Sequence, residues 1–249
     1  MIIINADDFG LNGHCSRAIA EAFEKGLITD TTMMATGEYF DEAVSLAAEK
    51  GFSDKIGIHL NLTEGVPLTG EIRHCPRFVL DGRFHKGHDR TQPLTRAEAD
   101  AVYRELSAQA RRMEDAGIRI THADSHHHVH TGEHIAPIAL RVCREHGIDK
   151  MRLFRNLGAY YEAHKTEADS FNALLRREGI RTVSFFVYMA DIGGIVLPDD
   201  TEILVHPDFD KDGRLIDRRR MTDGIPDGSI ITAVDTKGYA LGGYADRQG

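Results

Sequence analysis

Three short segments of the chain concentrate side chains that bind metal ions, and each follows a stretch that predicts a strand. The segments are Asn5–Gly10 with two aspartates, Gly57–Gly65 with one histidine and Asp124–His130 with four histidines. Carboxylates and imidazoles together are typical ligands of a divalent ion. Because the segments lie far apart in sequence, only folding can bring them together. A parallel α/β scaffold does this at the carboxyl ends of its strands, so the pattern predicts an enzyme.

The elements that must position these segments alternate between strand and helix along nearly the whole chain. The predicted strands are Met1–Asn5, Thr31–Thr36, Lys55–Leu62, Arg119–Asp124, Lys150–Phe154, Thr182–Phe186 and Glu202–His206, with an eighth at Tyr239–Tyr244 that two glycines interrupt. The predicted helices are His14–Lys25, Phe40–Lys50, Thr95–Ala116, Glu133–His146 and Ala168–Glu178. This alternation predicts a parallel α/β sheet, and the number of units favours a barrel. Two long loops, Glu64–Leu94 and Val187–Asp200, are typical of lids or substrate walls.

Composition narrows the class of protein. At 249 residues, with 41% hydrophobic and 28% charged residues, the chain predicts one soluble globular domain over residues 1–249. The net charge of −9 argues against nucleic acid or an anionic membrane as partner. The basic run Arg214–Arg220 has aspartates around it and predicts a solvated loop. Three cysteines cannot form a closed disulfide framework, and no stretch approaches the ~20 apolar residues that span a bilayer. The expected location is the cytoplasm, and a homodimer is an open expectation.

Strand alternation places His59 on the inner face. Along Ile56–Leu62, the apolar residues share one face, while Gly57, His59 and Asn61 share the other. If the apolar face packs under helices, His59 points inward near the end of its strand. The alternative is an ordinary hydrogen-bonded core histidine.

Asp7 and Asp8 are adjacent carboxylates at the end of a buried strand. Burying both without partners would cost several kcal/mol each. A metal ion for one and a proton-transfer role for the other would remove this cost. A helix N-cap is the alternative for one aspartate, but it does not account for both.

The histidine cluster is the most specific of the three motifs. In an extended conformation, Asp124, His126, His128 and His130 would share one face. A predicted strand precedes the cluster and an amphipathic helix follows it, which favours a metal site over a histidine-rich surface tail.

At these motifs the chain resembles the YdjC-like carbohydrate deacetylase family, which includes chitooligosaccharide deacetylases. The matching segments are Asn5–Gly10, His59 with Leu60–Thr63, Asp124–His130 and Val205–Pro207, in the same order and spacing. The resemblance implies a distorted (β/α) barrel of about seven parallel strands, similar to a TIM barrel, with the metal site at the C-terminal ends of the strands. It also implies metal-dependent removal of N-acetyl groups from acetylated sugars, such as N-acetylglucosamine oligomers.

The same resemblance implies roles for individual residues. Asp8, His59 and His126 look like the metal ligands, Asp7 like the catalytic base, and His206 matches a histidine near the leaving group. In the mechanism that we expect, metal-bound water attacks the acetyl carbonyl, Asp7 takes its proton, and protonated His206 gives a proton to the sugar amine.

Two further residues are candidates for the substrate site. Arg152, on the predicted strand Lys150–Phe154, could contact substrate, orient Asp7 by charge or be a plain salt-bridge partner. His128 could line the substrate pocket or contact a metal ligand.

The metal and the exact reaction stay open. Two imidazoles and one carboxylate suit Zn²⁺ by ligand softness, whereas the family is usually associated with Mg²⁺. The alternatives are a metal-dependent hydrolase of another amide, ester or phosphoester, a glycosidase, and a non-catalytic metal- or sugar-binding protein. The glycosidase needs two carboxylates and no metal, so the histidine cluster argues against it.

Overall fold

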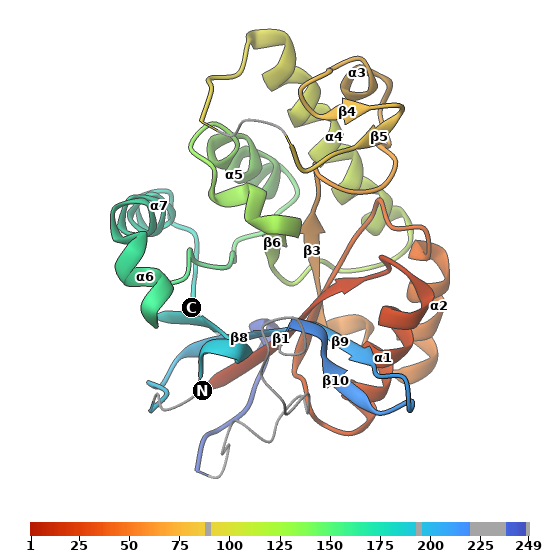
Figure 1. Cartoon of the computed structure of the whole chain (residues 1–249), viewed down its shortest axis with the longest axis vertical. Helices are drawn as coiled ribbons and strands as arrows, with labels where there is room; N and C mark the ends of the chain where they lie inside the picture. The colour runs from red at the N-terminus through yellow and green to blue at the C-terminus, as the bar shows by residue number, and fades with distance from the viewer. Residues whose placement is uncertain (88–90, 193–195, 220–237, 248–249) are drawn as a thin grey trace.

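A parallel six-stranded sheet forms the centre of the molecule (Figure 1). The computed structural model describes residues 1–87, 91–192, 196–219 and 238–247. In spatial order the strands are β6 (Ala123–Ser125), β3 (Ile56–Leu60), β2 (Asp30–Met33), β1 (Ile2–Phe9), β8 (Thr201–Val205) and β7 (Phe185–Tyr188). Every neighbouring pair is parallel. The predicted parallel α/β architecture is therefore confirmed.

The sheet curls so that its two edges approach each other. Ala123 of β6 forms a parallel bridge with Met151, and Lys150 forms one with Arg181, shortly before β7. The segment predicted as a strand at Lys150–Phe154 thus makes isolated bridges and is not a complete strand. The expected barrel of about seven strands is a curled sheet of six, partly closed by this segment.

Helices flank the sheet close to where the sequence predicts them. They are α1 (Gly13–Glu24), α2 (Phe40–Lys50), α3 (Gly70–Arg73), α4 (Arg96–Asp115), α5 (Ala136–Glu145), α6 (Ala159–Ala163) and α7 (Lys165–Arg177). The predicted capping box starts α4, since Thr95 and Glu98 each accept a hydrogen bond from the backbone N–H of the other. None of the described helices has the length and apolar character needed to cross a membrane.

Both predicted long loops contain structure of their own. The first holds α3 and the hairpin β4–β5 (Val79–Leu80 and Arg83–Phe84), and the second begins with the end of β7. Residues 88–90 and 193–195 of these loops lie outside the described residues. A further hairpin, β9–β10 (Pro207–Phe209 and Leu215–Asp217), follows β8 and packs on α1. The predicted strand Tyr239–Tyr244 contributes a single bridge, between Leu241 and Ile2.

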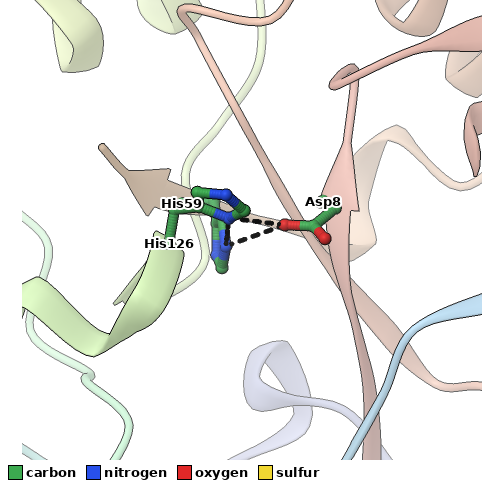
Figure 2. A group of neighbouring side chains, drawn as sticks. All are labelled: Asp8, His59 and His126. Atoms are coloured by element: carbon green, nitrogen blue, oxygen red, sulfur yellow. Dashed lines mark hydrogen bonds and ion pairs between the residues drawn. The ribbon is translucent and has the colours of Figure 1, made fainter. Parts of the chain in front are cut away.

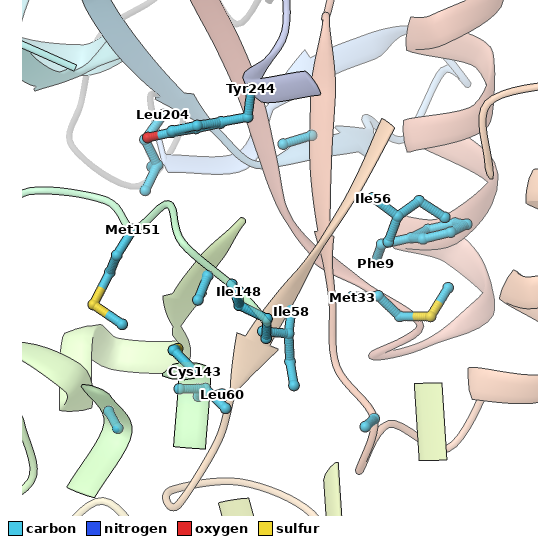
Figure 3. Close-up of a cluster of buried hydrophobic side chains, with 14 of the residues drawn as sticks. Phe9, Met33, Ile56, Ile58, Leu60, Cys143, Ile148, Met151, Leu204 and Tyr244 are labelled. Atoms are coloured by element: carbon cyan, nitrogen blue, oxygen red, sulfur yellow. The ribbon is translucent and has the colours of Figure 1, made fainter. Parts of the chain in front are cut away.

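The apolar face of β3 packs into the core as the alternation predicts. Ile56, Ile58 and Leu60 lie in the buried cluster of Figure 3. On the opposite face, Gly57 lies against the ring of His122, where an added Cβ would come within 2.5 Å of the imidazole. This inner face of β3 also carries the buried His59, which the sequence analysis predicts to be a metal ligand.

Candidate active site

Three side chains from three strand ends converge inside the curled sheet (Figure 2). Asp8 lies near the end of β1, His59 near the end of β3, and His126 directly follows β6. Oδ1 of Asp8 is 2.8 Å from Nδ1 of His126 and 3.3 Å from Nε2 of His59. The two nitrogens are 3.4 Å apart, and all three side chains are buried. The structure thus brings together the three residues that the resemblance implies as metal ligands.

The converging atoms fit a divalent ion. An ion–ligand distance of about 2.1 Å places neighbouring ligands roughly 3.0 Å apart in an octahedron and about 3.4 Å apart in a tetrahedron. The three observed separations are close to these values. Both imidazoles are near Oδ1 of Asp8, yet this buried oxygen accepts no well-aligned hydrogen bond from the described residues. A buried oxygen normally has a partner, and a cation at the point of convergence would supply one.

The far nitrogen of each histidine contacts a carboxylate. Nδ1 of His59 is 2.6 Å from Oδ1 of Asp124, and Nε2 of His126 is 3.0 Å from Oε2 of Glu64. The hydroxyl of Thr32 lies 3.1 Å from both Nδ1 of His59 and Oδ2 of Asp124. Metal-bound histidines commonly have such a partner, because it fixes the orientation of the ring and the tautomer. The contact of His59 with Asp124 is the one expected of a metal-bound histidine, and its role as a metal ligand stays a prediction.

The electrostatic field at this point favours positive charge. Burial works to lower the pKa of His59, but Asp124 outweighs it and raises that pKa to about 10. Burial also opposes the charged form of His126, whose pKa is nevertheless raised by Asp8 and Glu64. The carboxylates around the two imidazoles thus favour positive charge, which can be supplied by protons on the rings or by a metal ion. A metal ion can bind only after the ring nitrogens that face it have lost their protons.

The backbone of Asp8 explains how two adjacent aspartates serve one cavity. Asp8 has φ of +73°, and the pairing of β1 with β2 shifts register between Ala6 and Phe9. A non-glycine residue with positive φ is uncommon and is often found at functional sites. The alternative role for an aspartate as helix N-cap is not observed, since the N-cap of α1 is Asn12.

Asp7 has a fixed cationic partner. Nη1 and Nη2 of Arg152 donate to its two oxygens at 2.8 and 2.7 Å, and the amide of Asn5 donates to Oδ1 at 3.0 Å. Burial works to raise the pKa of Asp7, but the charge of Arg152 outweighs it and holds that pKa well below its usual range. Asp7 is therefore ionised at any working pH, although the same ion pair weakens its attraction for a proton.

Arg152 itself is completely buried among carboxylates. Besides Asp7, it contacts Asp124 at 2.6 Å and Glu202 at 2.7 Å, and the Tyr244 hydroxyl donates to Glu202 at 2.6 Å. A side chain with no exposed surface cannot reach a substrate, so the substrate-binding assignment of Arg152 does not fit this geometry. The guanidinium lies where it can orient Asp7, which is the second of the expected alternatives.

The histidine cluster does not continue the strand, and this part of the prediction is wrong. β6 ends at Ser125, and His126–Thr131 forms a tight turn in which His127 and His128 have φ of +50° and +54°. The shared face expected for His126 and His128 therefore does not exist. The turn places His128 against Tyr188, whose hydroxyl it contacts, at the wall of the cavity.

His206 lies at the end of β8 and faces the same cavity as Asp7 and Asp8. Its Nδ1 is buried and has no hydrogen-bond partner among the described residues. The two carboxylates work to keep it charged, but burial has the larger effect and lowers the pKa of His206 to about 4. The expected protonated imidazole is therefore not the resting form at neutral pH.

The cavity encloses about 570 Å³ of empty space, including the part open to solvent, and its lining contains residues that the sequence did not single out as functional. Arg218 lies in the run predicted as a solvated loop, yet its Nη2 is 2.8 Å from Oδ2 of Asp8. Arg219 also lines the cavity. Glu64, which contacts His126 as described above, is a carboxylate in the segment that contains His59, and this position could have identified it. Arg220, the end of that run, is outside the described residues.

Known proteins resemble this chain over nearly its whole length. A family model described as YdjC-like protein matches residues 1–233. A carbohydrate deacetylase from Brevibacillus brevis is 31% identical over 240 residues, which cover 96% of this chain and 93% of the relative. A solved structure from Enterococcus faecalis V583, described as a candidate cellobiose-phosphate cleavage protein, has 25% identity and a TM-score of 0.72, covering 98% of this chain and 97% of its own. The chain therefore belongs to the YdjC-like family.

Proposed function

We propose that the protein is a metal-dependent hydrolase that removes N-acetyl groups from acetylated sugars. The observation that carries the proposal is the pairing of two aspartates in one cavity. Asp8 joins two imidazoles at a cation site, while Asp7 is beside it and held ionised by Arg152. A passive metal-binding site has no use for the second carboxylate. The relative from Brevibacillus brevis, described as a carbohydrate deacetylase, supports this reaction.

Asp8, His59 and His126 would hold the ion. A divalent ion in this position lowers the pKa of water and polarises the acetyl carbonyl, which makes an unreactive amide susceptible to hydrolysis. The ligand set favours Zn²⁺ by softness, and the family resemblance favours Mg²⁺.

Asp7 and His206 would move the protons. Asp7 accepts the proton of the attacking water, because it is ionised and faces the cavity. His206 faces the same cavity and is the candidate donor to the departing amine. Because His206 is neutral at rest, it must first receive a proton, and Asp7 is the base beside it. Arg152 is a positioning residue that acts through Asp7.

Deacetylation fits the carboxylates better than cleavage of a glycosidic bond does. The description of the Enterococcus faecalis relative names cleavage of a phosphorylated disaccharide. Glycosidases place two carboxyl groups on either side of the scissile bond, one of them protonated. Here Asp7 and Asp8 are adjacent, and the pKa of each is lowered. Neither is suited to act as the acid.

Acetate release tests the proposal directly. Purified protein is assayed on N-acetylglucosamine oligomers after its metal is measured, and again after chelation and reloading with Zn²⁺ or Mg²⁺. We expect acetate from the loaded protein and none from the chelated protein. Loaded protein that releases no acetate from any acetylated sugar would exclude deacetylation. Release that chelation leaves unchanged would exclude the metal.

A further inference from the structure

Arg218 contacts one oxygen of the carboxylate at the candidate metal site. Its Nη2 is 2.8 Å from Oδ2 of Asp8, while Oδ1 of the same carboxylate lies where the rings of His59 and His126 converge. No described residue donates an aligned hydrogen bond to Oδ1. The two oxygens of Asp8 therefore have different surroundings, because one faces a cationic donor of the protein and the other faces the cation site.

The torsion of the Asp8 side chain does not by itself decide how many oxygens face the cation site. Asp8 lines the cavity, and rotation about the Cβ–Cγ bond of an aspartate has no sharply preferred angle. A carboxylate can bind a divalent ion through one oxygen or through both. A cationic donor on Oδ2 restricts this choice, because the charge-assisted hydrogen bond holds that oxygen away from the ion.

Arg218 is held in place by its backbone and by a second carboxylate. It directly follows β10, and its backbone N–H donates to the carbonyl of His206 at 2.9 Å. Its Nη1 is 4.0 Å from Oδ2 of Asp208 on β9, and Oδ1 of that aspartate is 2.6 Å from Nδ1 of His14. The guanidinium thus lies between Asp8 and Asp208, and the protein itself supplies both contacts.

Neither metal affinity nor stability accounts for an arginine at this position. A guanidinium in contact with a ligand carboxylate repels a divalent ion, so it weakens binding of the metal. The side chain of Arg218 is 38% exposed, and an ion pair of such a residue contributes little to stability. What the contact does supply is a fixed orientation of the carboxylate.

We infer that Arg218 is a positioning residue that keeps Asp8 a ligand through Oδ1 alone, so that one more coordination position stays open for water and substrate. Catalytic metal sites keep such a position, with three protein ligands and water in the remaining place. The inference rests on the proposed function and deepens it, because it assigns the number of open positions to a residue of this chain. Without the arginine, Oδ2 would also bind the ion and displace a water.

The test counts the waters on bound Mn²⁺, which prefers about six ligands and speeds the relaxation of the water protons that it binds. With Asp8, His59 and His126 as ligands, about three positions are left for water. Arg218→Met has a side chain of similar length that cannot donate a hydrogen bond. We expect about two waters in this variant, measured as a fall of roughly one third in the relaxation caused by protein-bound Mn²⁺.

The same variant should separate metal affinity from activity. Arg218→Met should bind Mn²⁺ at least as tightly as the wild type, since a repelling charge is lost and an oxygen ligand is gained. Its kcat for acetate release should fall on the order of 10- to 100-fold, the usual effect of changing a partner of a metal ligand. Electron paramagnetic resonance of free Mn²⁺ gives the dissociation constant. A merely structural role predicts weaker binding of Mn²⁺ instead.

Arg219→Met is the matched control for charge. Arg219 lines the same cavity, and its guanidinium carbon is 5.2 Å from the ring centre of Tyr188. This variant removes an equal charge but should keep the wild-type number of waters. Arg218→Lys retains a cationic donor for Oδ2 of Asp8 and should keep that number too. An unchanged number in Arg218→Met, or an equal fall in Arg218→Met and Arg219→Met, would overturn the inference while leaving deacetylation intact.

Acetate release separates this failure from failure of the proposed function. If the wild type binds Mn²⁺ but releases acetate from no acetylated sugar under any metal, deacetylation is excluded, and the water count still decides the role of Arg218. If the wild type binds no Mn²⁺, both proposals are overturned.

Discussion

Asp7 and Asp8 are neighbours in the sequence, but the structure surrounds them in opposite ways. Asp7 meets a fixed guanidinium and an amide, and both of its oxygens accept well-aligned hydrogen bonds. Asp8 pairs through Oδ2 with the half-exposed Arg218. Its Oδ1 faces two imidazoles, and no described residue donates an aligned hydrogen bond to it.

The difference shows two ways to bury a carboxylate. A permanent partner such as Arg152 keeps Asp7 charged and in place, which suits a base that must always be ionised. Asp8 Oδ1 has no such partner among the described residues, so its negative charge can be balanced by a cation that binds reversibly. The first arrangement fixes the side chain in place and the second is the one expected of a binding site, although the two side chains share one cavity.

The largest expected effect comes from removing an imidazole on the Asp8 side. His59→Ala or His126→Ala should abolish stoichiometric metal and acetate release, because each removes one of three protein ligands. Elemental analysis of the purified variants gives the measurement. His74→Ala, at an exposed histidine, is the control and should keep its metal. Full metal content in both ligand variants would show that the ion binds elsewhere.

Substitution of Asp7, in contrast, should leave metal binding intact. Asp7→Asn should retain the ion yet lose about 10²–10⁴-fold in kcat, the usual cost of losing a general base. The same elemental analysis, combined with acetate release, distinguishes the two aspartates. If Asp7→Asn loses the ion instead, the roles of Asp7 and Asp8 are reversed.

The two arginines should differ in their effect on stability. Arg152→Met leaves three buried carboxylates without their cation and should lower the free energy of unfolding by about 3–5 kcal/mol. Arg218→Met, at a side chain that is 38% exposed, should change it by about 1 kcal/mol or less. Urea denaturation of both variants measures this. Equal losses would show that Arg218 is as much a part of the fixed network as Arg152.

A smaller effect is expected from the outer contact of His126. Glu64→Gln should weaken metal binding about 10- to 100-fold without abolishing it, because the ring of His126 loses the carboxylate that orients it. Competition with a chelator of known affinity gives the dissociation constant. An unchanged dissociation constant would mean that the turn His126–Thr131 orients the ring of His126 without the help of Glu64.

The last prediction concerns pH and extends the comparison to the imidazoles. His130, unlike His59 and His126, is buried away from carboxylate partners, and burial lowers its pKa to about 3. Between pH 6.5 and 3 the unfolded chain therefore binds a proton at this residue that the folded chain does not. The contribution of His130 to stability is complete above pH 6.5 and is lost as pH falls, by at most about 1.4 kcal/mol per pH unit.

The variant His130→Gln should flatten this dependence. In chelated protein, urea denaturation from pH 6.5 to 4 should show a shallower loss of unfolding free energy than the wild type shows, whatever the absolute stability of the variant. The raised pKa values of His59 and His126 act above pH 6.5, so they do not obscure the slope. Parallel slopes in the two proteins would contradict the assignment.

Much of the fold and the ligand set could be predicted because both depend on local pattern. Glycines and a capping box mark the ends of α2 and α4, and apolar runs mark β1 and β8. The metal-binding residue types stand at strand ends, where a parallel sheet must gather them. The resemblance then implied Asp8, His59 and His126 as ligands, which the structure brings within 3.4 Å of one another.

The direction of side chains at the strand ends could not be predicted in the same way. Strand alternation fails at the positive φ of Asp8 and at the turn of His127 and His128, where the backbone leaves the extended region. It was correct for His59, which lies within a regular strand. The side-chain direction of a residue is therefore predictable only as far as the strand is regular.

By itself, the sequence determined the order of the elements, the residue types at the strand ends and, through its motifs, the family. Only the tertiary structure decided which charges meet: Arg152 with Asp7, Arg218 with Asp8, and Glu64 with His126. These partners are 145, 210 and 62 residues apart. The physical reason is that ionisation in a buried site depends on burial and on the nearest charges, and both exist only once the sheet has curled and closed around them.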